Sequence, residues 1–201
     1  DTNTRGFLPE LMDKIYQERT IYKKRMLKAK QEYEQTPTTD LKKEISRCNN
    51  IQMARKIQLN SAYGAIGNEH FRYYRLEIAE AITMSGQLSI RWIGDRMNAY
   101  LNKLLSSKNV DYVIASDTDS MYLNLGPLVD KFFANKSSDK AAIVTILDKI
   151  CENKLEPFIE SSYQELADYV SAYEQKMKMK RENIADRGIW TAKKRYILNV
   201  W

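Results

Sequence analysis

Two long segments with helical periodicity, separated by one short break, restrict most strongly what this chain can fold into. Over residues 8–34, apolar side chains recur three and four positions apart, which is the spacing of one face of an α-helix. The break QTPTTD at 35–40 contains Pro37 and a Thr/Asp cluster, so it favours a turn, and Asp40 is predicted to cap the next helix. That second helix is expected over about 41–62. The first third of the chain is therefore predicted to form an antiparallel helical hairpin.

The rest of the chain, from residue 67, mixes helical and strand patterns. The predicted elements are a long helix, a strand hairpin, three shorter helices and two strands, at 78–105, 112–125, 126–133, 141–151, 157–170, 176–180 and 196–201. Pro157 either starts the last helix or kinks one long helix, and DRG at 186–188 is expected to be a turn. The predicted fold class is α+β, with a helical hairpin at 1–66 and an antiparallel sheet packed by long helices at 67–201.

The positive charge of the chain is concentrated in the helical hairpin. The chain carries a formal net charge of +6, and residues 14–56 alone hold twelve Lys/Arg against five Asp/Glu, a surplus of seven. A basic block attached to a near-neutral body indicates an anionic partner for that block. The alternative is a pair of charged helices whose side chains are simply solvated.

The composition also argues against several classes of protein. No apolar run approaches the roughly 20 residues of a membrane span, so no membrane association is expected. Cys48 and Cys151 are far apart and His70 is the single histidine, so neither a zinc site nor an oxidising compartment is indicated. A cytoplasmic location is expected. The opening residues, DTNTRGFLPE, lack a Met and a signal-peptide pattern, which indicates a piece of a longer chain.

Two aspartates stand at the tip of the predicted strand hairpin, in the sequence YVIASDTDSMYLNL. Residues two apart in extended chain point to the same side, so Asp117 and Asp119 could direct both carboxylates at one spot. Around the turn, Thr118 and Ser120 could satisfy local backbone groups. Carboxylate oxygens suit Mg²⁺ or Mn²⁺, and a pair of such ions serves phosphoryl chemistry. The alternative is an ordinary turn on a surface hairpin, because D-x-D is a common sequence.

A polar stripe is predicted on the second helix, in RKIQLNSAYGAIGN. Lys56, Asn60 and Tyr63 fall at i, i+4 and i+7, so an ammonium, an amide and an aromatic ring follow one another along the helix. On the first helix, Arg19 and Lys23 are also four residues apart. If the helices pack antiparallel, both cationic pairs could face one triphosphate. The alternative is a helix whose Tyr packs in the core while its Lys is solvated.

A third cluster, KKRY, precedes the last predicted strand. It consists of Lys193, Lys194, Arg195 and Tyr196. Clustered cations beside an aromatic ring suit a nucleic-acid backbone. The alternative is a charged entrance to a strand, with no binding role.

Taken in order, these three motifs resemble those of the family B DNA polymerases. The family's K-x-x-x-N-S-x-Y-G, YGDTDS-type and KKRY motifs appear here as KIQLNSAYG at 56–64, SDTDS at 116–120 and KKRY at 193–196. The resemblance extends over essentially the whole chain, and viral and phage replicative members look closest.

The resemblance implies a role for each matching residue. Asp117 and Asp119 would lie around two catalytic Mg²⁺ ions, for which Mn²⁺ could substitute, and Lys56 would balance charge on the leaving pyrophosphate. Glu182 matches a further acid and a lower-ranked metal ligand, whereas Lys180 falls where some members carry an acid. The incoming deoxynucleotide (dNTP) would be held by Arg19, Lys23, Lys56, Asn60, Tyr63 and Gly64. Primer-template DNA would be contacted by Lys193, Lys194, Arg195 and Tyr196.

By the same resemblance, residues 1–66 would be the fingers and 67–201 most of the palm of a polymerase that transfers a nucleotide from dNTP to a primer 3′-hydroxyl by a two-metal mechanism. The family's other metal-binding acid lies in a D-x-x-S-L-Y-P-like motif, which this sequence lacks. The exonuclease, the upstream palm and the thumb would be further parts of the enzyme and therefore partners of this chain. Alone, the chain is expected not to extend a primer.

Two rival functions share some of these features. A metal-dependent glycosyltransferase also uses D-x-D, but it does not call for a basic helical hairpin or for KKRY. A non-catalytic helical module that binds nucleic acid would need the basic hairpin, but not the stripe at Lys56, Asn60 and Tyr63. Replacing Asp117 by Asn would leave the function of such a module intact.

Overall fold

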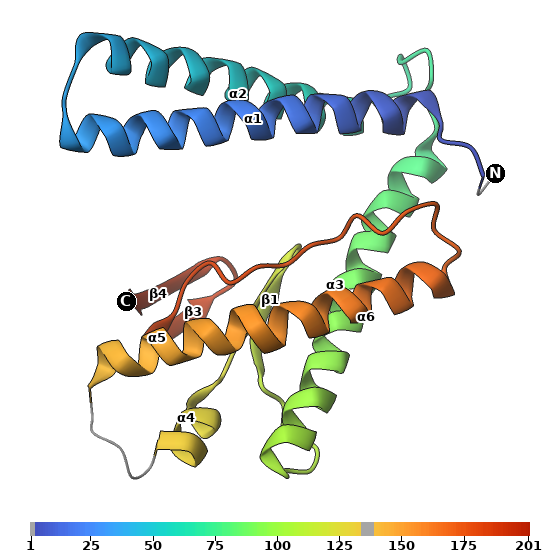
Figure 1. Ribbon diagram of the computed structural model, residues 1–201. Helices are drawn as coiled ribbons and strands as arrows, with labels where there is room; N and C mark the ends of the chain where they lie inside the picture. The colour runs from blue at the N-terminus through green and yellow to red at the C-terminus, as the bar shows by residue number, and fades with distance from the viewer. Residues whose placement is uncertain (1–2, 134–138) are drawn as a thin grey trace. The chain divides into compact units, whose positions relative to one another are not determined.

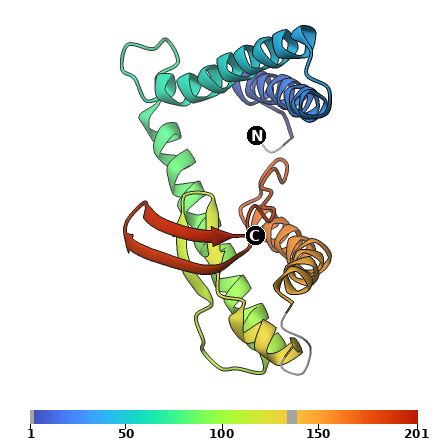
Figure 2. The same cartoon turned by 90° about the vertical axis from the view of Figure 1, so that its left-hand side faces the viewer.

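Two long helices lie side by side in the first part of the chain (Figures 1 and 2). The computed structural model describes residues 3–133 and 139–201. The chain divides into two units, Asp1–Thr83 and Met84–Trp201. In the first unit, α1 (Phe7–Gln35) and α2 (Thr39–Ile66) run antiparallel. The predicted helical hairpin is therefore observed.

The turn between these helices ends on a different cap from the predicted one. Thr38 is extended, with φ −130° and ψ 152°, and its side chain accepts a hydrogen bond from the backbone N–H of Leu41 at 3.2 Å. The prediction that Asp40 caps the helix is wrong, because the helix already begins at Thr39. Asp40 instead lies in the first turn, where a carboxylate interacts favourably with the helix dipole.

The helices pack along a narrow seam. Met26 and Ala29 of α1 are buried, as are Cys48 and Gln52 of α2. Many of the larger apolar side chains of the pair are at least partly exposed, including Ile57 at 61%. Full burial is thus confined to a few residues in the half of the hairpin nearer its turn.

The core of the second unit forms between α3 (Leu76–Leu105) and a helix later in the chain. Ile93, Met97 and Leu101 recur every four residues on α3 and are fully buried. They belong to one apolar cluster with Ile159 and Tyr163. The Trp92 indole N–H also donates a hydrogen bond to the backbone carbonyl of Ser162 at 2.9 Å. The helical period predicted from the sequence is therefore the one that builds this core.

The later helix is one continuous run with an irregular centre. It consists of α5 (Lys140–Ile150), a π-helical turn (Cys151–Leu155) and α6 (Glu156–Tyr169). Pro157 lies in the first turn of α6, where its missing N–H costs little. The alternative in which Pro157 starts a helical segment is therefore confirmed, although that segment continues directly from α5 and the π-helical turn. No helix within 3–133 or 139–201 is long and apolar enough to cross a membrane.

Two antiparallel strand pairs and a short helix complete the second unit. Strand β1 (Val113–Asp117) pairs with β2 (Ser120–Leu123), and β3 (Ala185–Ala192) pairs with β4 (Arg195–Val200). Helix α4 (Gly126–Phe133) follows β2. Figure 2 shows the two strand pairs lying against each other. The overall class is the predicted α+β.

Two of the predicted strand-region details are wrong. KMKMK at 176–180 is not a strand: Met179 packs against the apolar core, but Met177 is 40% exposed, so the two methionines do not share a buried face. The next residue, Arg181, is held by side chains, because its N–H donates to Glu156 Oε1 at 3.1 Å and its guanidinium pairs with Asp148. The DRG sequence at 186–188 lies inside β3 and is not a turn.

Candidate functional site

The two aspartates lie on the tight turn between β1 and β2. Asp117 ends β1 and pairs with Ser120, the first residue of β2. Thr118 has a positive φ of 47°, a region that is strained for a β-branched residue. Its hydroxyl donates to Asp117 Oδ1 at 3.1 Å, and the Ser120 hydroxyl donates to the Asp117 carbonyl oxygen at 3.2 Å. Ser120 thus satisfies a local backbone group as predicted, whereas Thr118 binds a side-chain carboxylate instead. Asp117 and Asp119 remain exposed.

The turn of the second strand pair approaches the first. Lys193 and Lys194 join β3 to β4, and Lys194 has a left-handed φ of 62°. Lys194 Nζ lies 3.9 Å from Asp117 Oδ2, with the two side chains 69% and 51% exposed. An ion pair this exposed contributes at most about 1 kcal/mol, so it marks proximity more than stability. The structure therefore brings together the predicted carboxylate and KKRY motifs.

Three aromatic rings join the two strand pairs. The Tyr122 ring centroid on β2 is 5.3 Å from that of Tyr196 on β4 and 5.5 Å from that of Trp190 on β3, both edge-to-face. Trp190 and Tyr196 are stacked at 6.3 Å. A Cβ added to Gly188 would lie 2.6 Å from the Trp190 ring, so only glycine leaves room for this arrangement. Of these three rings only Tyr196 belongs to a motif that is recognisable in the sequence; Tyr122 and Trp190 carry no signal there beyond being aromatic.

Electrostatics place two acids near Tyr122. A hydrogen bond with Tyr196 is the main cause that raises the pKa of Tyr122 to about 12, followed by burial, and the charges of Glu182 and Asp117 add to the effect. Burial, with the charge of Asp119, likewise raises the pKa of the Tyr163 hydroxyl. The charges of Glu182 and Asp117 thus act on Tyr122, whereas that of Asp119 acts on Tyr163.

The donor atoms of the two aspartates are of the type that binds divalent cations. Exposed carboxylate oxygens are the donors that Mg²⁺ and Mn²⁺ prefer, and Asp117 and Asp119 provide two such groups. Within the part of the chain that the structure describes, no three His, Cys, Asp or Glu side chains gather in a group that could hold a metal ion. Glu182 therefore does not complete a three-residue group with the two aspartates, and its role as a ligand stays a prediction.

Two of the predicted cations, Arg19 and Lys56, lie at about the same level of α1 and α2. Arg55 forms an ion pair with Glu18 at 2.8 Å, so these residues are level, and Arg19 and Lys56 directly follow them in the chain. Arg19 is half-buried, and its Nε is buried without a hydrogen-bond partner among the described residues. Lys56 is exposed.

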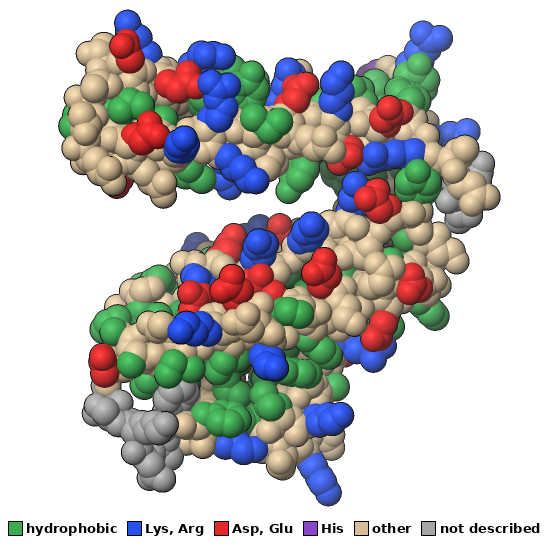
Figure 3. Space-filling view, in the orientation of Figure 1, with side chains coloured by type: hydrophobic (Ala, Val, Ile, Leu, Met, Phe, Trp, Pro, Cys, Tyr) green, Lys and Arg blue, Asp and Glu red, His purple; other side chains and the backbone are tan. Residues whose placement is uncertain are grey.

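Other cations neutralise the acids of the hairpin. Glu44 accepts from Arg25 at 2.6 Å and also pairs with Arg47 at 3.3 Å. The hydrogen bond from Cys48, with the two arginines, lowers the pKa of the Glu44 carboxyl. No ion pair involves Lys23 or Lys56 in residues 3–133 and 139–201. Figure 3 shows Lys and Arg side chains along both helices, interspersed with Asp and Glu. Lys23 and Lys56 are therefore among the hairpin cations that no carboxylate of the described residues neutralises, as are Lys14, Lys24, Lys30, Lys42 and Lys43.

Tyr63 and Gly64 line a small pocket at the end of α2. The pocket has a volume of about 300 Å³ and is completed by residues of the following turn and of α3, namely Gly67, Leu76, Ala79, Glu80 and Thr83. Tyr63 is 43% exposed, so it is not the core residue of the alternative interpretation. A Cβ added to Gly64 would meet nothing within 4 Å, and Asn60 is exposed one turn earlier. Packing in this unit does not require a glycine at 64.

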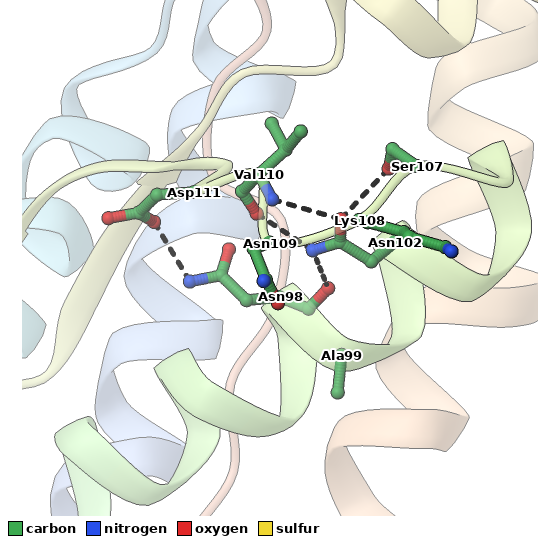
Figure 4. A pocket seen from close by; sticks show the side chains of 8 residues that line it. All are labelled: Asn98, Ala99, Asn102, Ser107, Lys108, Asn109, Val110 and Asp111. Atoms are coloured by element: carbon green, nitrogen blue, oxygen red, sulfur yellow. Dashed lines mark hydrogen bonds between the residues drawn. The ribbon is translucent and has the colours of Figure 1, made fainter.

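A larger polar pocket is lined by side chains that hold the loop before β1 in place. It has a volume of about 570 Å³ and lies where α3 meets the loop before β1 (Figure 4). Asn102 Nδ2 donates to the Val110 carbonyl at 2.7 Å, and Asn98 Oδ1 accepts from the Tyr112 N–H at 2.8 Å. Asn98 also donates to Asp111 at 2.8 Å. The side-chain amides of Asn98 and Asn102 are hydrogen-bonded to the loop, and so they fix where β1 begins. They therefore leave few free polar groups for a ligand in this pocket.

Comparison with known proteins gives a consistent result. Residues 1–142 match the model of the family described as DNA polymerase family B. The chain is 39% identical to the DNA-directed DNA polymerase of Enterobacteria phage T4 over 170 residues, which is 81% of this chain and 19% of that protein. It is 40% identical to the DNA-directed DNA polymerase of Escherichia phage RB69 over 158 residues, 75% of this chain and 18% of that one. A more distant relative, the DNA polymerase alpha catalytic subunit of Dictyostelium discoideum, is 30% identical over 122 residues, 61% of this chain and 7% of that subunit. The chain thus spans about a fifth of the length of the phage relatives.

Proposed function

Because this chain belongs to DNA polymerase family B, we propose that it is part of a DNA-directed DNA polymerase and supplies two portions of its nucleotidyl-transfer site. In that reaction the primer 3′-hydroxyl attacks the α-phosphorus of a dNTP and pyrophosphate leaves. The observation that carries the proposal is the turn at Asp117 and Asp119, which presents two exposed carboxylates beside the cation of Lys194.

In this proposal Asp117 and Asp119 hold Mg²⁺, or Mn²⁺, in a two-metal site. Such ions, when bound, supply the charge neutralisation and hydroxyl activation that phosphoryl transfer requires. The turn is strained at Thr118 and hydrogen-bonded at Asp117, and both carboxylates are exposed at its tip, where they would be accessible to a metal ion. A further acid would come from a D-x-x-S-L-Y-P-like segment elsewhere in the longer enzyme.

The cations of the helical hairpin would bind the triphosphate. Arg19 offers a fork of donors suited to phosphate oxygens, and the partnerless Nε at its half-buried position supports this role. Lys23 and Lys56 are exposed and carry charge that no carboxylate of the described residues neutralises. Lys56 would balance charge on the leaving pyrophosphate and donate a proton to it.

Recognition of the nascent base pair would fall to the end of α2. Asn60 and Tyr63 continue the stripe that begins at Lys56, and Gly64 leaves open space next to Tyr63. A flat ring beside an open position suits stacking and close approach of a base pair. In this proposal the helical hairpin is the fingers, which bring their cations to the substrate when they close.

Primer-template DNA would lie along the turn of β3 and β4. Lys193, Lys194 and Arg195 are exposed cations, and Tyr196 is 47% exposed. Phosphate contacts from such residues fix the position of a duplex without reading its sequence. In the proposal residues 67–201 are most of the palm, and they would place the primer end near Asp117.

One experiment tests the catalytic assignment in the longer polymerase. Replacing Asp117 by Asn removes a metal-binding charge while preserving shape, so single-nucleotide incorporation is expected to fall by about three orders of magnitude, the equivalent of several kcal/mol. Primer-template affinity should change by less than about twofold. The matched control is Asp130→Asn, an exposed acid of α4, which should leave both measurements unchanged.

The outcomes separate the rival functions. Unchanged function after Asp117→Asn, with DNA binding intact, would favour a non-catalytic nucleic-acid module. Binding of a UDP-sugar without DNA affinity would favour a glycosyltransferase. A complementary assay incubates the purified chain alone with primer-template, dNTPs and Mg²⁺. No extension is expected, and robust extension would show that the further acid is unnecessary.

A further inference from the structure

Tyr122 links two strand pairs that share no backbone hydrogen bonds. The pairs β1–β2 and β3–β4 form separate two-stranded sheets, and a two-stranded sheet is only marginally stable by itself. Tyr122 stands opposite Ala115, two pairs from the Asp117–Ser120 end of its hairpin. Its ring contacts Trp190 on one strand of the other pair and Tyr196 on the next.

We propose that Tyr122 is a positioning residue of the transfer site, which seats the β3–β4 pair against the β1–β2 hairpin and so holds Lys194 at the level of Asp117. This inference rests on the proposed function, because it concerns how the DNA-contacting cations are aligned with the carboxylates.

The contacts around Tyr122 are suited to this task. Edge-to-face ring pairs have directional preferences, so they fix orientation as well as separation. The ring contact at 5.3 Å with Tyr196 ties Tyr122 to the residue that directly follows the KKR cations. Gly188 leaves space for Trp190 on the other side of the cluster. The position of the strand pair is therefore determined by side chains and not by strand pairing.

The far end of the same strand pair is anchored separately. Asp186, near the start of β3, accepts from Lys140 of α5 at 2.7 Å and from Asn199 of β4 at 2.7 Å. At the turn end, the Lys194–Asp117 contact is exposed and 3.9 Å long, which is too weak to orient a hairpin. Tyr122 is thus the contact that can orient the turn end.

A double-mutant cycle in the longer polymerase tests the inference. Tyr122→Leu removes the ring contacts, and Lys194→Ala removes the cation that they position. Each single variant is expected to weaken primer-template binding by about two- to tenfold, the range of a single polar contact. The double variant should bind primer-template DNA no less tightly than the single variant with the lower affinity. The reason is that Lys194 no longer contributes to binding once it is misplaced. The KM for dNTP should not change.

A role in stability alone predicts a different result. In that case Tyr122→Leu would lower the melting temperature, yet Lys194→Ala would keep its full effect on DNA affinity in the Tyr122→Leu background. Such additivity would overturn the inference. Tyr100→Leu is the structural control, since Tyr100 stacks on Phe158 at 4.4 Å beside the core. It should lower stability while leaving the effect of Lys194→Ala intact.

Two further variants keep the test decisive. Tyr122→Phe retains the ring and loses the hydroxyl, so it should restore most of the DNA affinity lost in Tyr122→Leu. If Tyr122→Leu does not fold, Gly188→Ala displaces Trp190 from the opposite strand, and the same loss of coupling with Lys194 is expected. Asp117→Asn, measured for single-nucleotide incorporation by the longer polymerase, distinguishes the two claims, because normal incorporation by that variant would reject the proposed function itself.

Discussion

Lys194 Nζ lies 3.9 Å from Asp117 Oδ2, although 77 positions separate these residues in the chain. Two motifs that are independent in sequence therefore share one surface of the second unit. In this arrangement the ammonium group stands beside a carboxylate that is proposed to bind a metal ion, so the two cations compete for the same negative charge.

Removing that ammonium charge should strengthen metal binding. At about 4 Å, two unit charges in water interact by about 1 kcal/mol, and exposed pairs reach at most that value. Lys194→Gln is therefore expected to raise the affinity of the chain for Mn²⁺ by up to about fivefold, measured by titration calorimetry or electron paramagnetic resonance. Lys193→Gln, its neighbour on the same turn, should have a smaller effect. An unchanged affinity in Lys194→Gln would show that the contact does not influence the site.

Acid should weaken the anchor at Asp186. Hydrogen bonds from Lys140 and then Asn199 lower the pKa of this carboxyl from its usual 3.8 to about 2. A carboxyl with a lowered pKa contributes stability that is fully present above its unfolded value and is lost as the pH falls through its folded value. The loss should therefore occur between about pH 4 and pH 2.

Chemical denaturation at a series of pH values measures this effect. In Asp186→Asn, the free energy of unfolding should depend less steeply on pH over that window than in the parent chain. Glu160→Gln, at an exposed position of α6, serves as the control and should keep the parent slope. Equal slopes in the parent and in Asp186→Asn would contradict the assignment.

Gly188→Ala should disturb the aromatic cluster. The new methyl group would lie 2.6 Å from the Trp190 ring and 2.8 Å from Leu198, so the ring must move. Overpacking of this kind typically destabilises by about 1–3 kcal/mol. Thermal unfolding followed by near-ultraviolet circular dichroism would report both the loss of stability and the altered tryptophan environment. A parent-like spectrum and melting temperature would show that the ring yields easily.

Gly64→Ala should separate stability from activity. The added methyl group meets nothing within 4 Å, and alanine is favoured over glycine in a helix by up to about 1 kcal/mol, so stability should rise slightly. If a base pair approaches this position, the methyl group should obstruct it. Nucleotide incorporation by the longer polymerase should then fall about tenfold, because a tenfold change corresponds to about 1.4 kcal/mol, which is within the range for mild overpacking.

Gly94→Ala is the matched control for this prediction. Gly94 also lies inside a helix and has nothing within 4 Å of an added Cβ, so its replacement should stabilise to a similar extent without a loss of incorporation. Normal incorporation by Gly64→Ala would indicate that no substrate group comes close to this residue.

Local sequence patterns determined the helical parts of this protein. The three- and four-residue recurrence of apolar side chains predicted α1, α2 and α3 because a helix repeats every 3.6 residues whatever it packs against. The hydroxyls of Thr118 and Ser120 could likewise be assigned to the DTD turn, since their partners lie within three residues. The family was recognisable for a related reason, because its motifs are short and lie in a set order.

Tertiary structure decided which strands form and which side chains meet. KMKMK has the alternation of a strand but finds no partner strand, whereas DRG resembles a turn and is drawn into β3 by pairing with β4. The same holds for Tyr122, whose role depends on rings 68 and 74 positions further along the chain. Strand pairing and ring packing join residues that are distant in sequence, and the free energy of such contacts is not encoded in any local pattern.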